Sequence, residues 1–310
     1  MEKTKVSIIT TFYNAERFIV NAIHSVRCQI CPEQSFDIEY ILVDDHSPDN
    51  SRSIVENYIK KNGTNGDWKI IKPEKNLGCG GARRFGIQNA TGDLFMFLDA
   101  DDYYINSDFV RRAVYDIQSN NADIVEYGVI YNQPNGTQSN NTAPHKIVLE
   151  NPNIAELALF KDNLIKFNVW SKIYKRWVVE SFEYSDERTF EDVRTIPVWV
   201  WNAKKIVIMP TPEINYRAAS DSIIRTDWNK TRIGTISAIA SHFERFKHDR
   251  RIMKAMYSRA MIDLEAMLAN KSSENPGFNE MSKLNTYMLK FIYPNDWEKL
   301  TYEVENLNKT

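Results

Sequence analysis

The chain is 310 residues long, with 43% hydrophobic and 12% aromatic residues and a formal net charge of −2 at pH 7. This length and apolar content predict one large domain with a substantial core and a smaller appendage. The near-neutral charge argues against a general nucleic-acid-binding protein, which needs a basic excess to neutralise phosphates. No run reaches the roughly 18 apolar residues of a membrane span, so we expect a cytoplasmic protein that is at most peripheral to a membrane.

The sequence contains three cysteines, Cys28, Cys31 and Cys79. Cys28 and Cys31 are three positions apart, but no second pair at metal-ligand spacing accompanies them. The odd number also argues against a complete disulfide framework. We therefore expect free thiols in a reducing compartment, with a zinc or redox site as the alternative.

Strand-like and helix-like segments alternate along the first part of the chain. The expected strands, which are short and apolar, are residues 6–11, 38–43, 68–71 and 94–98. The expected helices, which have apolar residues at i, i+3 and i+4 spacing, are residues 15–27, 54–59 and about 82–89. This alternation predicts parallel βαβ units in an α/β fold, with helices on both faces of the sheet.

Less regular elements follow. We expect helices at residues 107–119 and 193–201, a helix that begins at or includes residues 170–174, strands at residues 122–131 and 206–209, and a polar turn at residues 133–144. Beyond about Thr226 the composition changes to a basic stretch with helical apolar spacing. These segments predict an α/β domain over residues 1–225 and a helical segment over residues 226–310.

Three carboxylates, Asp99, Asp101 and Asp102, directly follow the strand at residues 94–98. Unpaired carboxylates about 4 Å apart repel by roughly 1 kcal/mol in water and by several times more near a protein surface. A fold that gathers them favours a bound cation, and oxygen-only ligands favour Mg²⁺ or Mn²⁺. The alternative is that these residues cap the helix that follows.

Polar residues also follow the other three expected strands. They are Tyr13 after the first strand, Asp44 and Asp45 after the second, and the glycine-rich residues 78–81 after the third. Each cluster alone would be interpreted as a turn or a helix cap. Because ligands of open α/β sheets bind beyond the carboxyl ends of the strands, the four clusters together predict one ligand-binding crevice.

Two common nucleotide-binding motifs are absent. A dinucleotide-binding Rossmann fold has Gly-x-Gly-x-x-Gly directly after its first strand, whereas residues 11–14 here contain no glycine. The glycines at residues 78–81 follow a later strand, and the lysine of a phosphate-binding P-loop is missing. Nicotinamide and P-loop chemistry are therefore disfavoured.

Six motifs in order give the chain a specific resemblance. They are residues 6–14, 43–47, 76–78 with 82–87, 97–102, 170–175 and 190–192. Together they resemble family 2 glycosyltransferases with the GT-A fold, over about residues 4 to 223. The resemblance implies a Rossmann-like, mostly parallel sheet with a nucleotide-sugar half to about residue 102 and an acceptor half from about 103 to 225. It also implies inverting transfer of a sugar from a UDP-sugar to a hydroxyl of a saccharide or lipid-linked saccharide, in surface polysaccharide or glycolipid synthesis.

The resemblance assigns the donor nucleotide to residues at the first three strand ends. Thr11 and Tyr13 would contact the nucleobase, with Tyr13 stacking through its exposed ring. Asp45 would accept a hydrogen bond from the uracil imide, with Asp44 beside it. Arg83 would help to hold the nucleotide.

The resemblance also assigns the metal and the base. Asp101 would bind Mn²⁺ or Mg²⁺, with Asp99 near the ribose or the metal, and the ion would stabilise the charge of the departing diphosphate. Asp192 would take the proton of the acceptor hydroxyl in a single inverting displacement. Taken alone, Glu191 and Asp192 would be interpreted as the N-cap and first-turn acid of a helix.

Five residues are weaker candidates for contacts to the acceptor or the diphosphate: Asp102, Trp170, Lys172, Glu191 and Arg217. Lys172 is expected to line this side of the site, with the alternative that its helix packs in the core. Residues 214–217 are expected to close over the nucleotide. Many relatives have a basic residue after the Tyr-Arg pair, whereas this chain has Ala218 and Ala219, which leaves Arg217 as the candidate.

The segment after Thr226 contains a basic cluster with Lys247, His248, Arg250 and Arg251. One interpretation is an ordinary helical appendage. The other is a basic face that rests on an anionic membrane near a lipid-linked acceptor.

Two other functions remain as alternatives. One is a nucleotide-sugar nucleotidyltransferase, although such enzymes usually have a glycine- and arginine-rich phosphate loop after the first strand, which this chain lacks. The other is a catalytically silent module that binds nucleotide sugars. The presence of both Asp101 and Asp192 argues against the silent module.

Overall fold

A computed structural model describes residues 3–31, 36–133, 135–151, 155, 158–160, 162 and 164–217, and, nearer the C-terminus, residues 235, 238–239, 241–246, 249–256 and 258–259. The chain divides into two compact units. The first is Met1–Ala155 with Leu164–Ala219, and the second is Glu156–Asn163 with Ser220–Thr310. The domain boundary near residue 225 stays a prediction.

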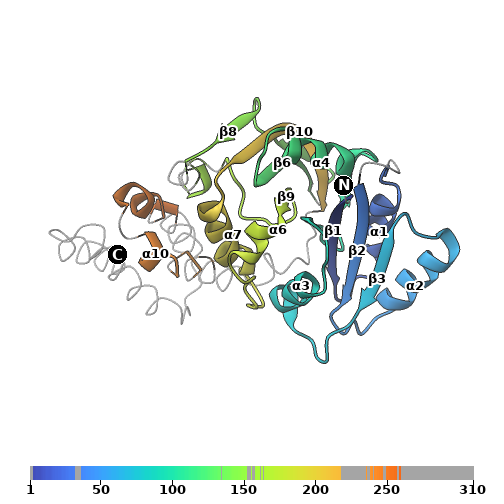
Figure 1. The fold of residues 1–310 in the computed structure, drawn as a ribbon. Coiled ribbons are helices and arrows are strands. Elements are labelled where there is room, and N and C mark those ends of the chain that lie inside the picture. Colours follow the sequence, from blue (N-terminus) through green and yellow to red (C-terminus); the bar gives the residue numbers. More distant parts are fainter. Residues whose placement is uncertain are drawn as a thin grey trace. The chain divides into compact units, whose positions relative to one another are not determined.

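The first unit contains a ten-stranded mixed sheet in the order β3-β2-β1-β4-β9-β6-β10-β5, with β7 beside β6 and β8 beside β10 (Figure 1). Its strands are β1 (Thr4–Phe12), β2 (Phe36–Asp44), β3 (Asp67–Ile71), β4 (Leu94–Phe97), β5 (Tyr103–Tyr104), β6 (Ile124–Asn132), β7 (Gln138–Asn141), β8 (Ile147–Leu149), β9 (Lys172–Lys175) and β10 (Ile206–Arg217). The longest pairings, β1 with β2 and β6 with β10, are parallel. The predicted α/β class with a largely parallel sheet is therefore confirmed.

The helices of the first unit are α1 (Ile19–Arg27), α2 (Ser51–Asn62), α3 (Gly78–Gln88), α4 (Phe109–Ser119), α6 (Arg176–Glu180) and α7 (Glu191–Asn202). α3 packs on β1 and β2, α4 on β6 and β9, and α6 on β4 and β9. Consecutive residues of β1, such as Ile8 and Ile9, are both buried. Because neighbouring residues of a strand point to opposite faces, this burial means that both faces of the sheet are covered.

α7 is anchored in the core by aromatic packing. The Trp199 ring lies 5.2 Å from Tyr174, 5.6 Å from Tyr184 and 6.3 Å from Phe97, centroid to centroid. The Trp199 indole N–H donates to the Phe182 carbonyl at 3.0 Å. These contacts fix the helix whose first turn contains the predicted base.

The predicted helix over residues 170–174 is wrong. Residues 172–175 form β9, which pairs antiparallel with both β4 and β6. The spacing of Trp170, Lys172 and Tyr174 matches a strand as well as a helix, since i and i+4 share a face in both. Lys172 is buried at the first position of this strand, and the sequence gives no sign that its charge would be paired inside the sheet.

Three other expectations need correction. α3 begins at Gly78, earlier than the predicted residue 82. The polar residues after β6 include β7, which forms a hairpin with β6. The strand predicted at residues 206–209 continues to Arg217 through an irregularity between Ile208 and Ile214, so residues 214–217 are sheet rather than a segment that closes over a ligand.

The second unit is described only in part. It contains the short helix α10 (Phe243–Phe246), and the Phe246 ring lies 6.3 Å from Phe160. Of the predicted basic cluster, Lys247 and His248 lie outside the described residues, while Arg251 pairs with Asp249 at 2.9 Å. Within the described part of the chain, no helix is long and apolar enough to cross a membrane.

Candidate active site

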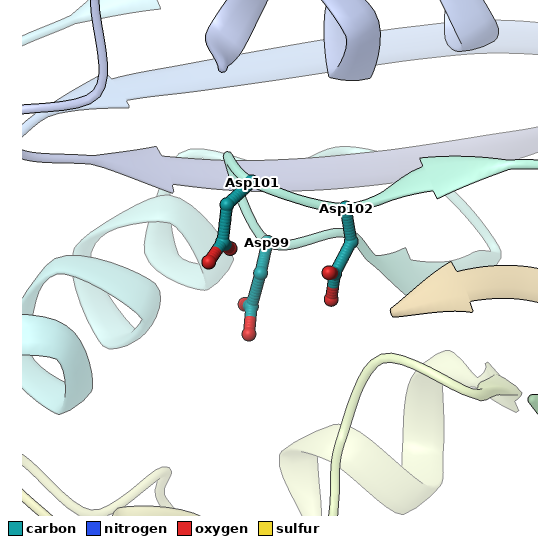
Figure 2. Close-up of side chains that lie close together, drawn as sticks. All are labelled: Asp99, Asp101 and Asp102. Atoms are coloured by element: carbon teal, nitrogen blue, oxygen red, sulfur yellow. The ribbon is translucent and has the colours of Figure 1, made fainter. Parts of the chain in front are cut away.

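The three carboxylates that follow β4 gather at the carboxyl edge of the sheet. One oxygen atom from each of Asp99, Asp101 and Asp102 lies within 4.8 Å of the others. Figure 2 shows the three side chains leaving one loop and pointing in the same direction. Asp99 and Asp101 are half-buried, and Asp102 is fully buried. The structure therefore brings together the acidic cluster that the sequence predicts.

Burial makes this cluster unfavourable in its ionised form. Burial and the nearby charge of Asp99 raise the pKa of Asp101 to about 6. Burial and the charges of Asp101 and Asp99 raise the pKa of Asp102 well above its ordinary value. Protons or a cation must therefore offset the charge of the cluster at neutral pH.

Asp102 has an unused oxygen. Its Oδ1 accepts a hydrogen bond from the backbone N–H of Arg217 at 2.9 Å, whereas its buried Oδ2 has no hydrogen-bond partner among the described residues. A buried carboxylate oxygen without a partner is costly, so a ligand is expected there. Oxygen-only donors at this spacing fit a divalent cation such as Mg²⁺ or Mn²⁺.

The alternative that these acids cap the next helix is wrong. The cluster leads directly into β5, and α4 begins only at Phe109, with Asp108 at its N-cap position. Asp102 instead bonds to the end of β10. The charges are therefore held by the sheet edge and not by a helix dipole.

The predicted nucleotide residue Asp45 joins two loops. Its carboxylate accepts hydrogen bonds from the backbone N–H groups of Leu77 at 2.7 Å and Gly78 at 2.8 Å. The Asn76 amide donates to the Asp45 carbonyl at 2.7 Å. Burial raises the pKa of Asp45 despite these bonds. Each carboxylate oxygen retains a lone pair, so the residue can still accept a hydrogen bond from a ligand.

The neighbouring Asp44 is a structural carboxylate. It is buried, accepts a bond from the Ser47 N–H at 2.8 Å, and lies 3.5 Å from Arg52 and 3.7 Å from Lys72. These contacts stabilise the loop that presents Asp45. A direct contact between Asp44 and a nucleotide stays a prediction.

Tyr13 and Thr11 lie at the end of β1. The Tyr13 side chain is 55% exposed, although large aromatic side chains are usually buried. Thr11 is half-buried and pairs with Val43 of β2. An exposed ring at the strand end leaves a face free for stacking, which is the geometry the nucleobase contact requires.

Arg83 on α3 bridges two carboxylates. Its Nη2 donates to Asp99 at 2.5 Å, and its Nη1 bonds to Glu191 at the start of α7. The Tyr184 hydroxyl lies 3.4 Å from the same Nη1. Arg83 is only 5% exposed. Its guanidinium therefore points at protein carboxylates rather than at open space, and its predicted role in holding the nucleotide stays a prediction.

Asp192 lies in the first turn of α7, one residue after Glu191. Burial and the charge of Glu191 raise its pKa to about 7. Its Oδ1 accepts a hydrogen bond from the N–H of Val193 at 2.7 Å. The preceding Phe190 has a left-handed φ of 61°, a conformation that costs free energy for a bulky residue. A half-buried carboxyl with a pKa near neutrality has the properties of a general base.

Three aromatic rings lie next to the acidic cluster. Trp170 stacks on Tyr216 at 5.3 Å with an interplanar angle of 9°, and Tyr131 lies 5.3 Å from Tyr216. The charges of Asp102, Asp99 and Asp101 add to burial in raising the pKa of Tyr216, which places the ring close to them. Neither Tyr131 nor Tyr216 was predicted as a site residue, although Tyr216 belongs to the segment 214–217 that was expected to close over the nucleotide. Their positions at the ends of two adjacent strands were the available signal.

Lys172 does not line an open site. Its side chain is fully buried, and its amine donates to the Asn168 carbonyl at 2.6 Å and lies 3.6 Å from Glu126. Burial lowers the pKa of Lys172 and raises that of Glu126. We therefore assign this lysine a structural role within β9.

Arg217 lies beside the cluster at the end of β10. Its backbone N–H bonds to Asp102, and its guanidinium carbon lies 4.2 Å from the centre of the Phe18 ring. The positive charge of Arg217 lowers the pKa values of Asp101 and Asp102, against the larger effect of burial. Arg217 is half-buried, so the side chain remains a candidate for diphosphate contact.

Comparison with known proteins shows which family this architecture belongs to. A model of the family "Glycosyl transferase family 2" matches residues 7–176, which is more than half of the chain. The uncharacterized glycosyltransferase EpsJ of Bacillus subtilis is 34% identical over 61% of this chain and 52% of its own length, so the chain spans about half of that relative. The poly(ribitol-phosphate) β-N-acetylglucosaminyltransferase TarS of Staphylococcus aureus is 32% identical over 39% of this chain and 20% of its own.

A solved structure supports the same fold. The crystal structure of S. aureus TarS residues 1–349 superposes with a TM-score of 0.68 at 18% identity, covering 93% of this chain and 81% of that one. A second structure of the same TarS fragment contains UDP-GlcNAc and has a TM-score of 0.65. The fold is that of a GT-A glycosyltransferase. The chain belongs to glycosyl transferase family 2.

Proposed function

We propose that this protein is an inverting, metal-dependent glycosyltransferase that moves a sugar from a UDP-sugar to a hydroxyl of a saccharide or lipid-linked saccharide. The observation on which the proposal depends is the acidic cluster, in which one Asp102 oxygen has no partner among the described residues, at the same sheet edge as Asp45. That edge has a place for a nucleobase, a place for a diphosphate with its cation, and a separate carboxyl group at Asp192.

The donor is held by side chains from three strand ends. Tyr13 stacks on the nucleobase, with Thr11 beside it, and Asp45 accepts the imide N–H. Asp101, with Asp99 and Asp102, holds Mn²⁺ or Mg²⁺, which when bound offsets the charge that develops on the leaving diphosphate. Arg217 adds a second positive charge next to this position.

Asp192 acts as the general base. It removes the proton from the acceptor hydroxyl while the hydroxyl oxygen bonds to the anomeric carbon and the bond from that carbon to the diphosphate oxygen breaks. The proton goes to Asp192, the electron pair leaves with UDP, and the configuration at the anomeric carbon inverts. The pKa of about 7 matches this role, because the carboxylate is both populated and basic near neutral pH.

The acceptor side is formed by the ends of β6 and β10. Tyr131 and Tyr216 are half-buried and offer ring surface and hydroxyl groups, which suit a sugar ring, while the buried Trp170 stacks against Tyr216. The relatives support a role in surface polysaccharide or teichoic acid synthesis, since TarS is named as a poly(ribitol-phosphate) β-N-acetylglucosaminyltransferase and another relative as a teichoic acid poly(glycerol phosphate) polymerase. A location at the inner face of a membrane would agree with a lipid-linked acceptor.

Isothermal calorimetry with UDP-Glc, UDP-Gal, UDP-GlcNAc and UDP-GalNAc, with Mn²⁺ and with chelator, tests the donor assignment. We expect one sugar nucleotide to bind more tightly than the others and to be hydrolysed slowly without acceptor. Binding of UDP with equal affinity with and without Mn²⁺ would refute the metal-dependent mechanism. Tight binding without any hydrolysis or transfer would instead identify a silent binding module.

A further inference from the structure

The Arg83 side chain lies between the two halves of the proposed chemistry. Asp99, which it contacts at 2.5 Å, belongs to the acidic cluster at the end of β4. Glu191, its other partner, directly precedes Asp192 in the first turn of α7. The guanidinium is a planar fork with fixed donor directions, so binding two carboxylates at once fixes the distance between them.

The segment before Asp192 packs closely against the first turn of α3, the helix that contains Arg83. A Cβ on Gly80 would lie 2.4 Å from the carbonyl oxygens of Ser185 and Glu187, and 2.9 Å from Glu191 Cβ. A Cβ on Gly78, whose φ is 75°, would lie 2.7 Å from Cγ of Arg188. At Gly78 and Gly80 the first turn of α3 thus has no room for a side chain, because Ser185, Glu187, Arg188 and Glu191 occupy that space.

Burial distinguishes Arg83 from its neighbour on the same helix. The Arg83 side chain is 7% exposed and its partner Glu191 is 8% exposed, whereas Arg84 is 33% exposed and pairs with Glu183 and Asp186, which are 62% and 72% exposed. Exposed pairs are usually worth little, while removing one partner of a buried pair leaves an uncompensated charge. Among the described residues, Arg83 is paired with both the acidic cluster and α7, whereas Arg84 is paired with neither.

From these contacts we infer that Arg83 is a positioning residue that sets the separation of the metal-binding carboxylates and the base Asp192, and that it does not contact the nucleotide. This inference rests on the proposed function for the roles of the two sites. The left-handed Phe190 backbone fits the same arrangement, since a strained residue persists only where its surroundings hold it. Through its contacts to Asp99 and Glu191, Arg83 holds the acidic cluster on one side and the first turn of α7 on the other.

The test compares Arg83→Gln with Arg84→Gln in the full chain. With chelator present, UDP affinity of Arg83→Gln should stay within about twofold of wild type, because no nucleotide contact is lost. With Mn²⁺ and the preferred UDP-sugar, kcat should fall by roughly 30-fold or more, because Asp192 is no longer held at the required position. Arg84→Gln should stay within about twofold in both measurements.

A double-mutant cycle with Asp192→Asn separates positioning from general destabilisation. If Arg83 acts through Asp192, adding Arg83→Gln to Asp192→Asn should lower kcat by less than about threefold, because the group that Arg83 positions is already inactive. Fully additive losses would overturn the inference. So would a tenfold or larger loss of UDP affinity with chelator, which would show a direct contact with the nucleotide.

Glu191→Gln interrupts the same link from the other side and covers the case in which Arg83→Gln fails to fold. It should lower kcat by roughly tenfold, non-additively with Asp192→Asn, and leave UDP affinity with chelator unchanged. Unchanged kcat in a folded Glu191→Gln variant would refute the link. If wild-type protein turns over no UDP-sugar, the proposed function fails, while the chelator measurement on the Arg83 variants still decides whether Arg83 touches the nucleotide.

Discussion

Buried carboxylates at the two ends of the parallel strands differ in how completely the protein pairs them. Toward the amino end of β2, Glu39 is fully buried and accepts bonds from Ser7 at 2.5 Å, Lys69 at 2.8 Å and the Thr91 N–H and hydroxyl at 2.8 and 2.9 Å. Although burial alone would raise it, these bonds hold the pKa of Glu39 at about 2. At the carboxyl end, Asp102 is equally buried, and one of its oxygens has no partner among the described residues.

The difference shows at which end of the strands the protein itself supplies all partners of a buried carboxylate. At the amino end the protein itself supplies every donor and the cation, so the carboxylate contributes to stability. At the carboxyl end burial raises the pKa values of Asp101, Asp102 and Asp192, and an external group is needed to offset the charge. An unpartnered buried atom alone does not mark a ligand site, since Glu126 Oε2 and Arg112 Nε also lack a partner among the described residues. At Asp102 the unpartnered oxygen lies among three carboxylates, and this combination indicates a ligand site.

The strongest test of this comparison removes a metal-binding side chain from the carboxyl end of the strands. Asp101→Ala should lower sugar transfer by roughly 10³-fold, because the cation that stabilises the leaving diphosphate is worth several kcal/mol. UDP should then bind with the same affinity in Mn²⁺ and in chelator, as measured by calorimetry. Asp93→Asn, at the amino end of the same strand region, is the control and should retain metal dependence. If Asp101→Ala retains it too, the cluster does not hold the cation.

The second test concerns the base. Asp192→Asn keeps the size of the side chain but cannot take a proton, so turnover should fall by roughly 10²-fold or more while UDP-sugar affinity stays near wild type. In wild type, kcat/KM should rise with pH and reach half its maximum near pH 7, because the carboxyl must be ionised to act. The exposed Asp186→Asn variant controls for lost charge near α7. Survival of more than about a tenth of the activity would place the base elsewhere.

The third test addresses the amino end of the strands, where Glu39 is buried. Glu39→Gln should reduce the free energy of unfolding by about 2 to 3 kcal/mol at pH 7, since the folded-state pKa of about 2 lies well below its ordinary value. A depressed carboxyl pKa stabilises the fold above about pH 5, and this contribution is lost as the pH falls toward 2. Urea unfolding at pH 7 and pH 3 measures both effects, and the variant should show a smaller difference between them.

A control on the same strand makes this test specific. Asp37 is exposed and pairs only weakly with Lys3, at 3.4 Å. Asp37→Asn should change stability by less than about 0.5 kcal/mol. Glu39→Gln should leave UDP affinity unchanged, and a loss of donor binding would mean that the two ends of the sheet are not independent.

The smallest effects are expected from the basic cluster of the second unit. Replacing Lys247, Arg250 and Arg251 one at a time by Gln should lower the affinity for anionic vesicles, measured by sedimentation, by about fivefold at most, because each basic residue near such a surface contributes about 1 kcal/mol. Donor hydrolysis and metal-dependent UDP binding should not change. Unchanged vesicle binding would remove the membrane role, and lost hydrolysis in a folded variant would connect this segment to the donor site.

Much of the fold could be predicted because it depends on local patterns. Strands β1, β2 and β4 follow from short apolar runs that end at polar residues, and their observed bounds lie within two residues of the predicted ones. The parallel order of βαβ units then places Asp45 and the acidic cluster at one edge without further information. Prediction failed at β9, because the buried Lys172 is paired by Glu126 on the neighbouring strand and by the Asn168 carbonyl, and no local pattern indicates these partners.

The sequence by itself determined which residues lie at the carboxyl ends of the strands, because alternating apolar segments fix both the strands and their direction. Only the tertiary structure decided what those residues do to one another. Arg83 is 16 positions from Asp99 and 108 from Glu191, and no local pattern indicates that its guanidinium lies between them. The raised pKa of Asp192 likewise depends on burial among segments distant in the chain, and burial exists only after the sheet and α7 have packed.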